Sequence, residues 1–299
     1  MFNRDKVHLG IAPIGWCNDD MPELGAENTF RQIISEMALA GFTGCEIGNK
    51  YPSDPAVLKW ELDLRGMRIA SRWFSCFLLS KPYEEIEKDF LRELDFLKAV
   101  GANRINVSEQ SRSIQGRTDI PILGDRKPVM NDAEWAHFTQ GLDRLGKAAL
   151  ERGFKLCFHH HMGTVVQSAG ETDRMMASTD PRYVFLCYDT GHFTFAGEDP
   201  LKMLQKYADR VGHVHLKDMR HEVAAKAREE GWSFLKAVRE GVFTIPGNGD
   251  VDFDPILKLL TEANYEGWLL VEAEQDPAKA NPLEYAKKAR EFIREHTGL

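Results

Sequence analysis

Short apolar runs rich in β-branched residues alternate along the chain with longer segments in which apolar residues recur at helical spacing. Near-continuous apolar runs separated by helices are typical of parallel strands that are covered on their outer face. Eight strand–helix units fit a closed barrel better than a doubly wound sheet, so the sequence predicts an α/β fold, a single (β/α)8 TIM barrel in one domain over residues 1–299. The eight runs are residues 8–15, 44–49, 68–75, 104–109, 155–161, 184–192, 211–218 and 267–274.

Five segments carry the amphipathic pattern of a helix most clearly. The first three are followed by Gly41, Gly101 and Gly153, and glycine is common just after the end of a helix. Two connections, 110–131 and 219–248, are longer than a barrel needs. Both follow carboxyl ends of strands, where barrel active sites lie, so we expect them to form lids or substrate walls. The five helical segments are 27–40, 83–100, 132–152, 253–264 and 282–297.

Ionisable residues gather where the predicted strands end. Alternation with a period of two places His159 and His161 on one face of their strand and His160 on the other. It also places His213, His215 and Lys217 on one face of the seventh strand, and it places Glu272 and Glu274 on one face of the eighth. These strand-end residues are Glu46, Asn106, Glu109, His159, His160, His161, Asp189, His192, His213, His215, Lys217, Asp218, Glu272 and Glu274.

Such convergence predicts a metal centre, because buried ionisable groups are costly unless they are paired or bound to an ion. Asp189, His215 and Glu272 fall at the same level of three successive strands, and His159 completes the set. A mixed oxygen and nitrogen set favours Mn²⁺, Co²⁺, Fe²⁺ or Zn²⁺ over Ca²⁺. The set contains no thiolate, which argues against a structural zinc site.

Composition narrows the classes of function. The net charge of -8 argues against non-specific binding to nucleic acid or to anionic membranes. The sequence has no apolar run long enough for a membrane span and no signal-peptide pattern, so we expect a cytoplasmic protein. The 5 cysteines show no CxxC spacing and indicate small buried side chains rather than a disulfide framework. No GxGxxG follows the first strand, which weakens a dinucleotide-binding alternative.

Three motifs carry a resemblance to a known superfamily. YDTGH (188–192), HVHLKD (213–218) and VEAE (271–274) resemble the xylose-isomerase-like barrels, which include sugar epimerases, hydroxypyruvate isomerase and endonuclease IV-type enzymes. Within it, the segments 11–25, 105–116 and 158–167 resemble the inosose dehydratase family of bacterial inositol catabolism. The resemblance implies a metal-dependent lyase, with Mn²⁺ or Co²⁺ as the expected ion, that converts 2-keto-myo-inositol (scyllo-inosose) to a trihydroxycyclohexane-1,2-dione. It also implies glutathione as a cofactor, although no feature of the sequence forms a glutathione site.

The superfamily's usual metal ligands are Glu, Asp, His and Glu. Asp189, His215 and Glu272 match that pattern, whereas His159 replaces the first glutamate. The replacement removes one potential base, so a two-base ketose isomerase or epimerase, the main alternative, fits less well than a dehydratase. An endonuclease-like protein would need a metal cluster and a basic DNA track, and this acidic chain carries too few extra ligands for one. A non-catalytic sugar-binding barrel is a further alternative.

Dehydration of a keto-cyclitol needs a base near the α C–H and an acid near the leaving hydroxyl. The candidates for acid, base and enolate stabilisation are His161, His192 and Lys217, and we expect neighbouring cations to depress the pKa of Lys217. The partner is a small cyclitol ketone; the oligomeric state, including a homo-oligomer, stays open. Candidates for substrate binding are Trp16, Asn18, Asp19, Glu46, Lys50, Asn106, Glu109 and Gln110, with Asp20, Trp73, Ser113 and Gln115 as further candidates.

Overall fold

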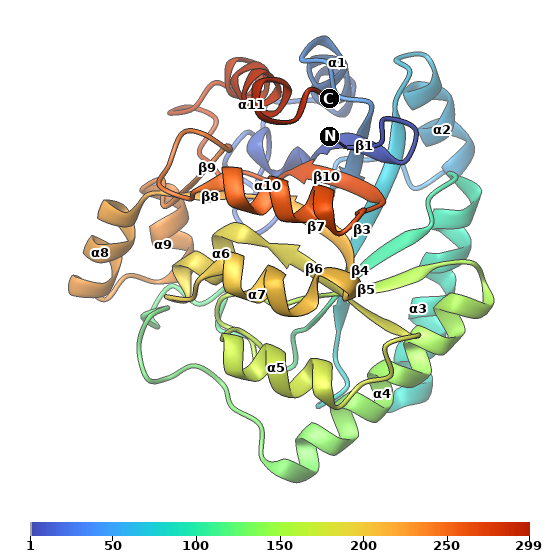
Figure 1. Cartoon of the computed structure of the whole chain (residues 1–299), viewed down its shortest axis with the longest axis vertical. Coiled ribbons are helices and arrows are strands. Elements are labelled where there is room, and N and C mark those ends of the chain that lie inside the picture. The colour runs from blue at the N-terminus through green and yellow to red at the C-terminus, as the bar shows by residue number, and fades with distance from the viewer. Residues whose placement is uncertain (1) are drawn as a thin grey trace.

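The computed structural model describes residues 2–299 and contains a closed barrel of parallel strands in the order β1-β10-β7-β6-β5-β4-β3-β2 (Figure 1). The predicted barrel is therefore confirmed, and each predicted strand contributes one barrel strand. Several predicted runs extend past the strand into the loop at its carboxyl end. The strands are β1 Val7–Ile11, β2 Gly44–Ile47, β3 Arg68–Cys76, β4 Arg104–Glu109, β5 Lys155–His159, β6 Val184–Asp189, β7 Val211–Leu216 and β10 Gly267–Val271.

Helices cover the outside of the barrel, and the five predicted segments all form helices. The sequence reasoning missed α2, α5 and α7, although each begins with a recognisable cap. Asp54 and Asp199 cap helices whose first residue is proline, and Ser168 forms a capping box with Glu171. The outer helices are α1 Phe30–Leu39, α2 Pro55–Asp63, α3 Tyr83–Ala99, α4 Asp132–Glu151, α5 Ala169–Ala177, α7 Pro200–Tyr207, α10 Phe253–Glu262 and α11 Pro282–Thr297.

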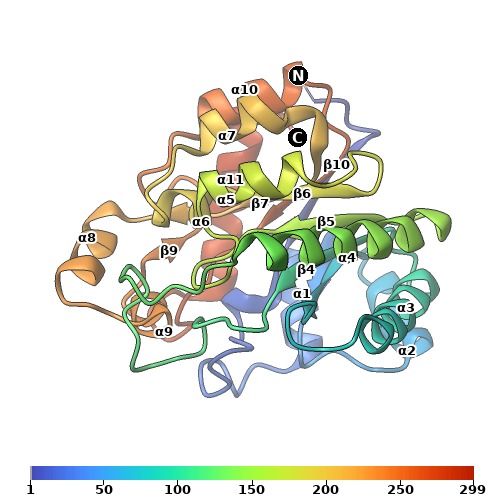
Figure 2. The same ribbon diagram turned by 90° about the horizontal axis from the view of Figure 1, so that it is seen from below.

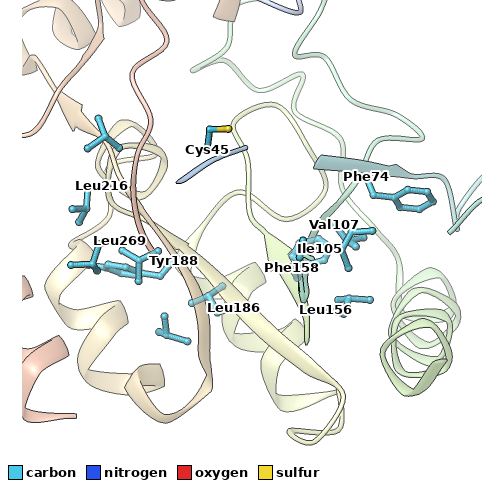
Figure 3. Packing of buried hydrophobic residues seen from close by; sticks show 14 of the residues in the cluster. Cys45, Phe74, Ile105, Val107, Leu156, Phe158, Leu186, Tyr188, Leu216 and Leu269 are labelled. Atoms are coloured by element: carbon cyan, nitrogen blue, oxygen red, sulfur yellow. The ribbon is translucent and has the colours of Figure 1, made fainter. Parts of the chain in front are cut away.

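The main core lies between the strands and these helices. Figure 3 shows apolar side chains of one strand face, among them Val107 on β4, Phe158 on β5 and Tyr188 on β6, all of which are buried. Because side chains alternate along a strand, the other face is left for residues that point into the barrel. Inside the barrel Trp268 packs so closely on β2 that a Cβ at Gly44 would lie 2.2 Å from its ring. Glycine is therefore required at that position.

The long connection 219–248, which the sequence predicts to be a lid or a substrate wall, is a folded insertion after β7. It contains α8 His221–Glu229, α9 Phe234–Arg239 and β9 Phe243–Thr244, which pairs with β8 Asp218–Met219. Both Figure 1 and Figure 2 show α8 and α9 at the same end of the barrel as the green segment that follows β4. Asp218 holds the insertion in place, since its carboxylate accepts backbone N–H groups of Met219, Gly247, Gly249 and Val251.

The insertion packs with loops from other strands into a second apolar cluster, which we call the roof. The apolar side chains of these loops pack against each other above the carboxyl ends of the strands, and burial of their apolar surface stabilises the roof. The short helix α6 Thr190–Phe195, directly after β6, joins it. The roof contains Met21, Leu24, Ile114, Ile122, Met162, Phe195, Met219, Ala227, Trp232, Phe234, Leu235, Ala237, Val238, Val242 and Phe243.

Two further predictions concern the whole chain. All 5 cysteines are buried and unpaired in the described structure, as expected for small core side chains. Within residues 2–299, no helix has both the length and the apolar character needed to cross a membrane.

Candidate active site

Four predicted residues from neighbouring strands converge at the carboxyl end of the barrel. Asp189 on β6 and His215 on β7 are register partners, His159 ends β5, and Glu272 follows β10 directly. His159 Nε2 lies 3.2 Å from His215 Nδ1 and 3.4 Å from Asp189 Oδ2. His215 Nδ1 also lies 3.4 Å from Asp189 Oδ2 and contacts Glu272 Oε2. We call these four residues the metal group.

The metal group has the properties that a divalent ion requires. All four side chains are buried or nearly so, and their ligand atoms lie within 4.8 Å of one another. Metal–ligand bonds of about 2.0 to 2.2 Å place neighbouring ligand atoms about 3.0 to 3.5 Å apart, which matches these distances. Among residues 2–299, Asp189 Oδ2 and Glu272 Oε2 have no hydrogen-bond donor, although both are buried. Buried carboxylate oxygens without donors fit a bound cation.

Glu46 on β2 adjoins this group and orients His215. Its Oε1 accepts from His215 Nε2 at 3.0 Å and from His213 Nε2 at 3.1 Å, and Ser71 and Asn106 also donate to it. Burial would raise the pKa of Glu46, but the two histidines overcome it and hold the pKa well below its ordinary value. With Nε2 donating to a carboxylate, His215 presents Nδ1 to the metal group.

Lys217 lies beside the metal group and is fully buried. Its Nζ donates to Glu274 Oε1 at 2.6 Å and to Glu272 Oε1 at 3.1 Å, and Asp189 Oδ2 lies 3.6 Å away. Burial alone would lower the pKa of Lys217, but these three carboxylates raise it above its ordinary value. The predicted depression of the pKa is therefore wrong, because carboxylates and not cations dominate its surroundings. Lys217 is thus paired with Glu274, whereas the neighbouring Asp218 binds backbone amides.

His161 and His192 contact each other, with ring centroids 3.9 Å apart. His161 Nδ1 donates to the carbonyl of Met162 at 2.9 Å, which leaves Nε2 as a proton acceptor. Burial, reinforced by nearby cationic groups, lowers the pKa of His161 to about 3 and holds the pKa of His192 well below its ordinary value. His192 lies in α6 and not on a strand, and its Nε2 is 3.0 Å from Lys217 Nζ. His160 points away, as alternation predicts, and stacks on Phe193.

A cavity of about 300 Å³ opens above the metal group. Asp19 and Glu46, both predicted to bind substrate, line it, and so do the further candidates Asp20, Trp73 and Gln115. Burial raises the pKa of Glu274, which also lines the cavity, to about 7. In the sequence Glu274 was predicted only as a strand-end residue, without a role of its own, and Arg72 was not predicted. Other lining residues are Ala12, Pro13, Ile14, Ile47, Gly48, Asn49, Ser75, His161, His215 and Glu272.

Two predicted substrate contacts from the loop after β1 serve the loop itself. Trp16 is fully buried away from this cavity, and its indole N–H donates to Glu36 at 2.6 Å. Asn18 Oδ1 accepts the backbone N–H groups of Asp20 and Met21, both at 2.9 Å. These hydrogen bonds fix the path of the loop, and neither side chain lines the cavity.

Two charged residues predicted to bind substrate are also structural. Lys50 Nζ donates to three backbone carbonyls of residues 25–28, at 2.7, 2.9 and 2.6 Å. Glu109 is buried and accepts the backbone N–H groups of Leu78 at 2.8 Å and Ser111 at 2.9 Å. All three N–H donors of Lys50 are used by backbone carbonyls, Glu109 holds two backbone N–H groups, and neither side chain lines the cavity.

Asn106 and Gln110 do not line the cavity that the described residues form. Asn106 donates to Glu46 at 2.7 Å and supports it from below, whereas Gln110 donates to Ser108 at 3.1 Å. Neither side chain is therefore placed to contact a molecule in this cavity, and Asn106 belongs to the support of Glu46.

The family model of the xylose isomerase-like TIM barrel matches residues 34–296. The chain belongs to this family. It is 58% identical to the inosose dehydratase of Clostridium tetani and 59% identical to that of Geobacillus thermodenitrificans, over 299 residues and 100% of both chains in each case. The structure of this chain is similar to the solved structure of the IolI protein with a binding zinc atom, with a TM-score of 0.73. The two chains are 14% identical, and the match covers 98% of this chain and 100% of that chain. At such low identity, this similarity shows that the two proteins share a fold.

Proposed function

We propose that this protein is a metal-dependent dehydratase that converts 2-keto-myo-inositol to a trihydroxycyclohexane-1,2-dione. The observation that carries the proposal is full-length identity of 58% and 59% to inosose dehydratases, combined with a metal group beneath a cavity. Replacement of the family's usual strand-five glutamate by His159 leaves two carboxylates in the group. That favours a dehydratase over an epimerase that shuttles protons between two glutamates.

His159, Asp189, His215 and Glu272 are the residues that would hold the ion, and Mn²⁺ or Co²⁺ is the ion we propose. When bound, the ion would supply Lewis acidity for the substrate ketone, which makes the α proton more acidic. The protein's own contribution is to fix these side chains. Glu46 sets the tautomer of His215, and the backbone N–H of His192 donates to Asp189 Oδ1 at 2.8 Å, which leaves Oδ2 for the ion.

Proton transfer is assigned to His161 and Glu274, two of the ionisable groups that line the cavity. One takes the proton from the α carbon, and the other protonates the hydroxyl that leaves the β carbon as water. The enol that results tautomerises to the dione. His192 and Lys217, two of the predicted catalytic residues, stand behind them and act as positioning residues, because Lys217 contacts both Glu274 and His192.

The surroundings of the substrate follow from the same cavity. Asp19 and Glu46 offer acceptors for ring hydroxyls, and Trp73 offers an apolar face for the C–H side of a ring. We carry over glutathione as a cofactor from the resemblance to inosose dehydratases, and we keep the cytoplasmic location, expected from the sequence pattern, as part of the proposal. Omission of glutathione from the assay tests the first directly.

The experiment is incubation of the purified protein with 2-keto-myo-inositol and Mn²⁺ or Co²⁺, with and without glutathione, while ultraviolet absorbance follows the dione. Wild-type protein should form the dione, and His161→Gln should lower kcat by about 10² to 10⁴. His137→Gln is the matched control, because His137 contacts only a backbone carbonyl on the outer side of the barrel. Metal-loaded, folded protein that forms no dione would refute the proposal, and an isomeric ketose in its place would indicate an epimerase.

A further inference from the structure

A second set of potential metal ligands adjoins the metal group. His161, His192 and Glu274 each offer a ligand atom, and these atoms lie within 4.8 Å of one another in a buried position. Three protein ligands are enough to hold a divalent ion in a catalytic site. The expectation that the chain has too few extra ligands for a metal cluster is therefore wrong. Something else must decide whether a second ion binds.

The side chain that occupies this position is Lys217. Its Nζ lies 2.6 Å from Glu274 Oε1, 3.0 Å from His192 Nε2 and 3.1 Å from Glu272 Oε1, with Asp189 Oδ2 at 3.6 Å. Three carboxylates and an imidazole nitrogen thus surround one ammonium group. Carboxylate and imidazole are also the ligands that Mn²⁺, Co²⁺ and Zn²⁺ prefer.

Packing fixes the ammonium group at this point. The aliphatic stem of Lys217 lies against the backbone of α6, so close that a Cβ at Gly191 would be 2.5 Å from Cγ. On another side Nζ lies 4.7 Å from the centre of the Phe243 ring, which belongs to the roof. The side chain is fully buried, so it has no alternative position in solvent.

We propose that the ammonium group of Lys217 is a built-in cation that takes the place of a second metal ion and restricts this barrel to one ion. The inference rests on the metal centre proposed above. The charges support it, because Asp189, Glu272 and Glu274, once all are ionised, carry three negative charges that one divalent ion and one ammonium group cancel. A second divalent ion beside the ammonium group would leave two positive charges uncompensated among these carboxylates, which a buried site does not tolerate. Glu46 lies on the far side of His215, where it binds the two histidines.

Removal of the ammonium group should therefore open the second position. Lys217→Met keeps a stem of similar length without the charge, and Lys217→Arg keeps the charge. Bound Mn²⁺ per chain, measured by equilibrium dialysis with elemental analysis, should be one for wild type, two for Lys217→Met and one for Lys217→Arg. The two ions of Lys217→Met should give the electron paramagnetic resonance spectrum of a coupled manganese pair. Adding Glu274→Gln to Lys217→Met should return the number to one.

Circular dichroism establishes that each variant is folded, and Lys217→Gln replaces Lys217→Met if the latter is not. A folded, uncharged variant that binds a single ion would overturn the inference. So would wild-type protein that binds two ions, a measurement that requires no variant and leaves the proposed metal centre intact. Wild-type protein that binds none would overturn both the inference and the metal centre.

Discussion

Replacement of Glu46 by glutamine tests whether this residue, which adjoins the metal group, sets its affinity for an ion. The variant keeps the size of the side chain and one carbonyl acceptor but removes the negative charge. In the wild-type structure His215 and His213 both donate to Glu46 Oε1, at 3.0 and 3.1 Å. Hydrogen bonds to an ionised acceptor are about twice as strong as those to a neutral one. His215 should therefore lose basicity at Nδ1 and hold its orientation less firmly.

The magnitude follows from what partners of metal ligands contribute elsewhere. Loss of such a partner lowers metal affinity by about 10- to 100-fold, which corresponds to about 1.4 to 2.7 kcal/mol. Glu46→Gln should come near the upper end, because Oε1 accepts from both histidines and from Asn106 at 2.7 Å. The fold should persist, since these donors still face an amide oxygen.

The assay is titration of metal-free protein with Mn²⁺, followed by calorimetry or by the electron paramagnetic resonance signal of the free ion. Glu61→Gln is the matched control, because Glu61 is also buried but accepts from Arg31 at 2.6 Å and Arg65 at 3.0 Å on the outside of the barrel. It should change stability without changing Mn²⁺ affinity. An affinity of Glu46→Gln within about threefold of wild type, or an equal loss in Glu61→Gln, would refute the reasoning.

Three further predictions concern the roof, a buried carboxyl and the metal. Asp218→Asn should lower the free energy of unfolding, measured by urea denaturation, by about 2 to 4 kcal/mol, because an NH₂ group then faces the N–H groups of Gly247 and Gly249. A loss below about 0.5 kcal/mol would contradict this prediction. Burial raises the pKa of Glu109 above 4.5 despite its backbone donors. The folded state therefore keeps this proton to higher pH than the unfolded state does. Wild type should lose stability relative to Glu109→Gln as pH rises through the raised pKa, and a difference in the free energy of unfolding between the two that does not change with pH would contradict this prediction. Mn²⁺ at about 100 times its Kd should raise the free energy of unfolding by about 2.7 kcal/mol, reversed by a chelator; no change would show that the metal group does not bind the ion.

The pattern of the sequence was sufficient for the barrel, because each strand carries its own apolar run and each strand end its own polar residue. It was less informative where a motif crosses an element boundary. Asp189 ends β6 and also caps α6 through the N–H of His192. The run 184–192 therefore reads as one strand in sequence but folds into a strand and a helix. The insertion 219–248 was missed for a related reason, since its helices are short and bury their apolar faces in the roof.

The polar residues of loops were the least predictable part of the site. Lys50, Asn18 and Glu109 have the chemistry of substrate ligands, and sequence does not reveal which backbone groups lie within their reach. The pKa of Lys217 shows the same limit, because its direction depends on how many carboxylates and cations surround it in space. Strand alternation orders residues along one strand only. The contacts of Lys217 with Glu274 and His192 depend on how the strands close into a barrel, so they could be seen only in the structure.

The burial of the cysteines has a practical consequence for work on this enzyme. Burial raises the pKa of Cys17 and Cys157 to about 11 and that of Cys45 and Cys187 to about 12, and it raises the pKa of Cys76 as well. Thiolate is the nucleophilic form, so alkylating reagents and disulfides find little to react with near neutral pH. A single cysteine introduced on an exposed helix, for example at Lys258, can therefore be labelled for fluorescence or spin spectroscopy while all five native cysteines stay in place.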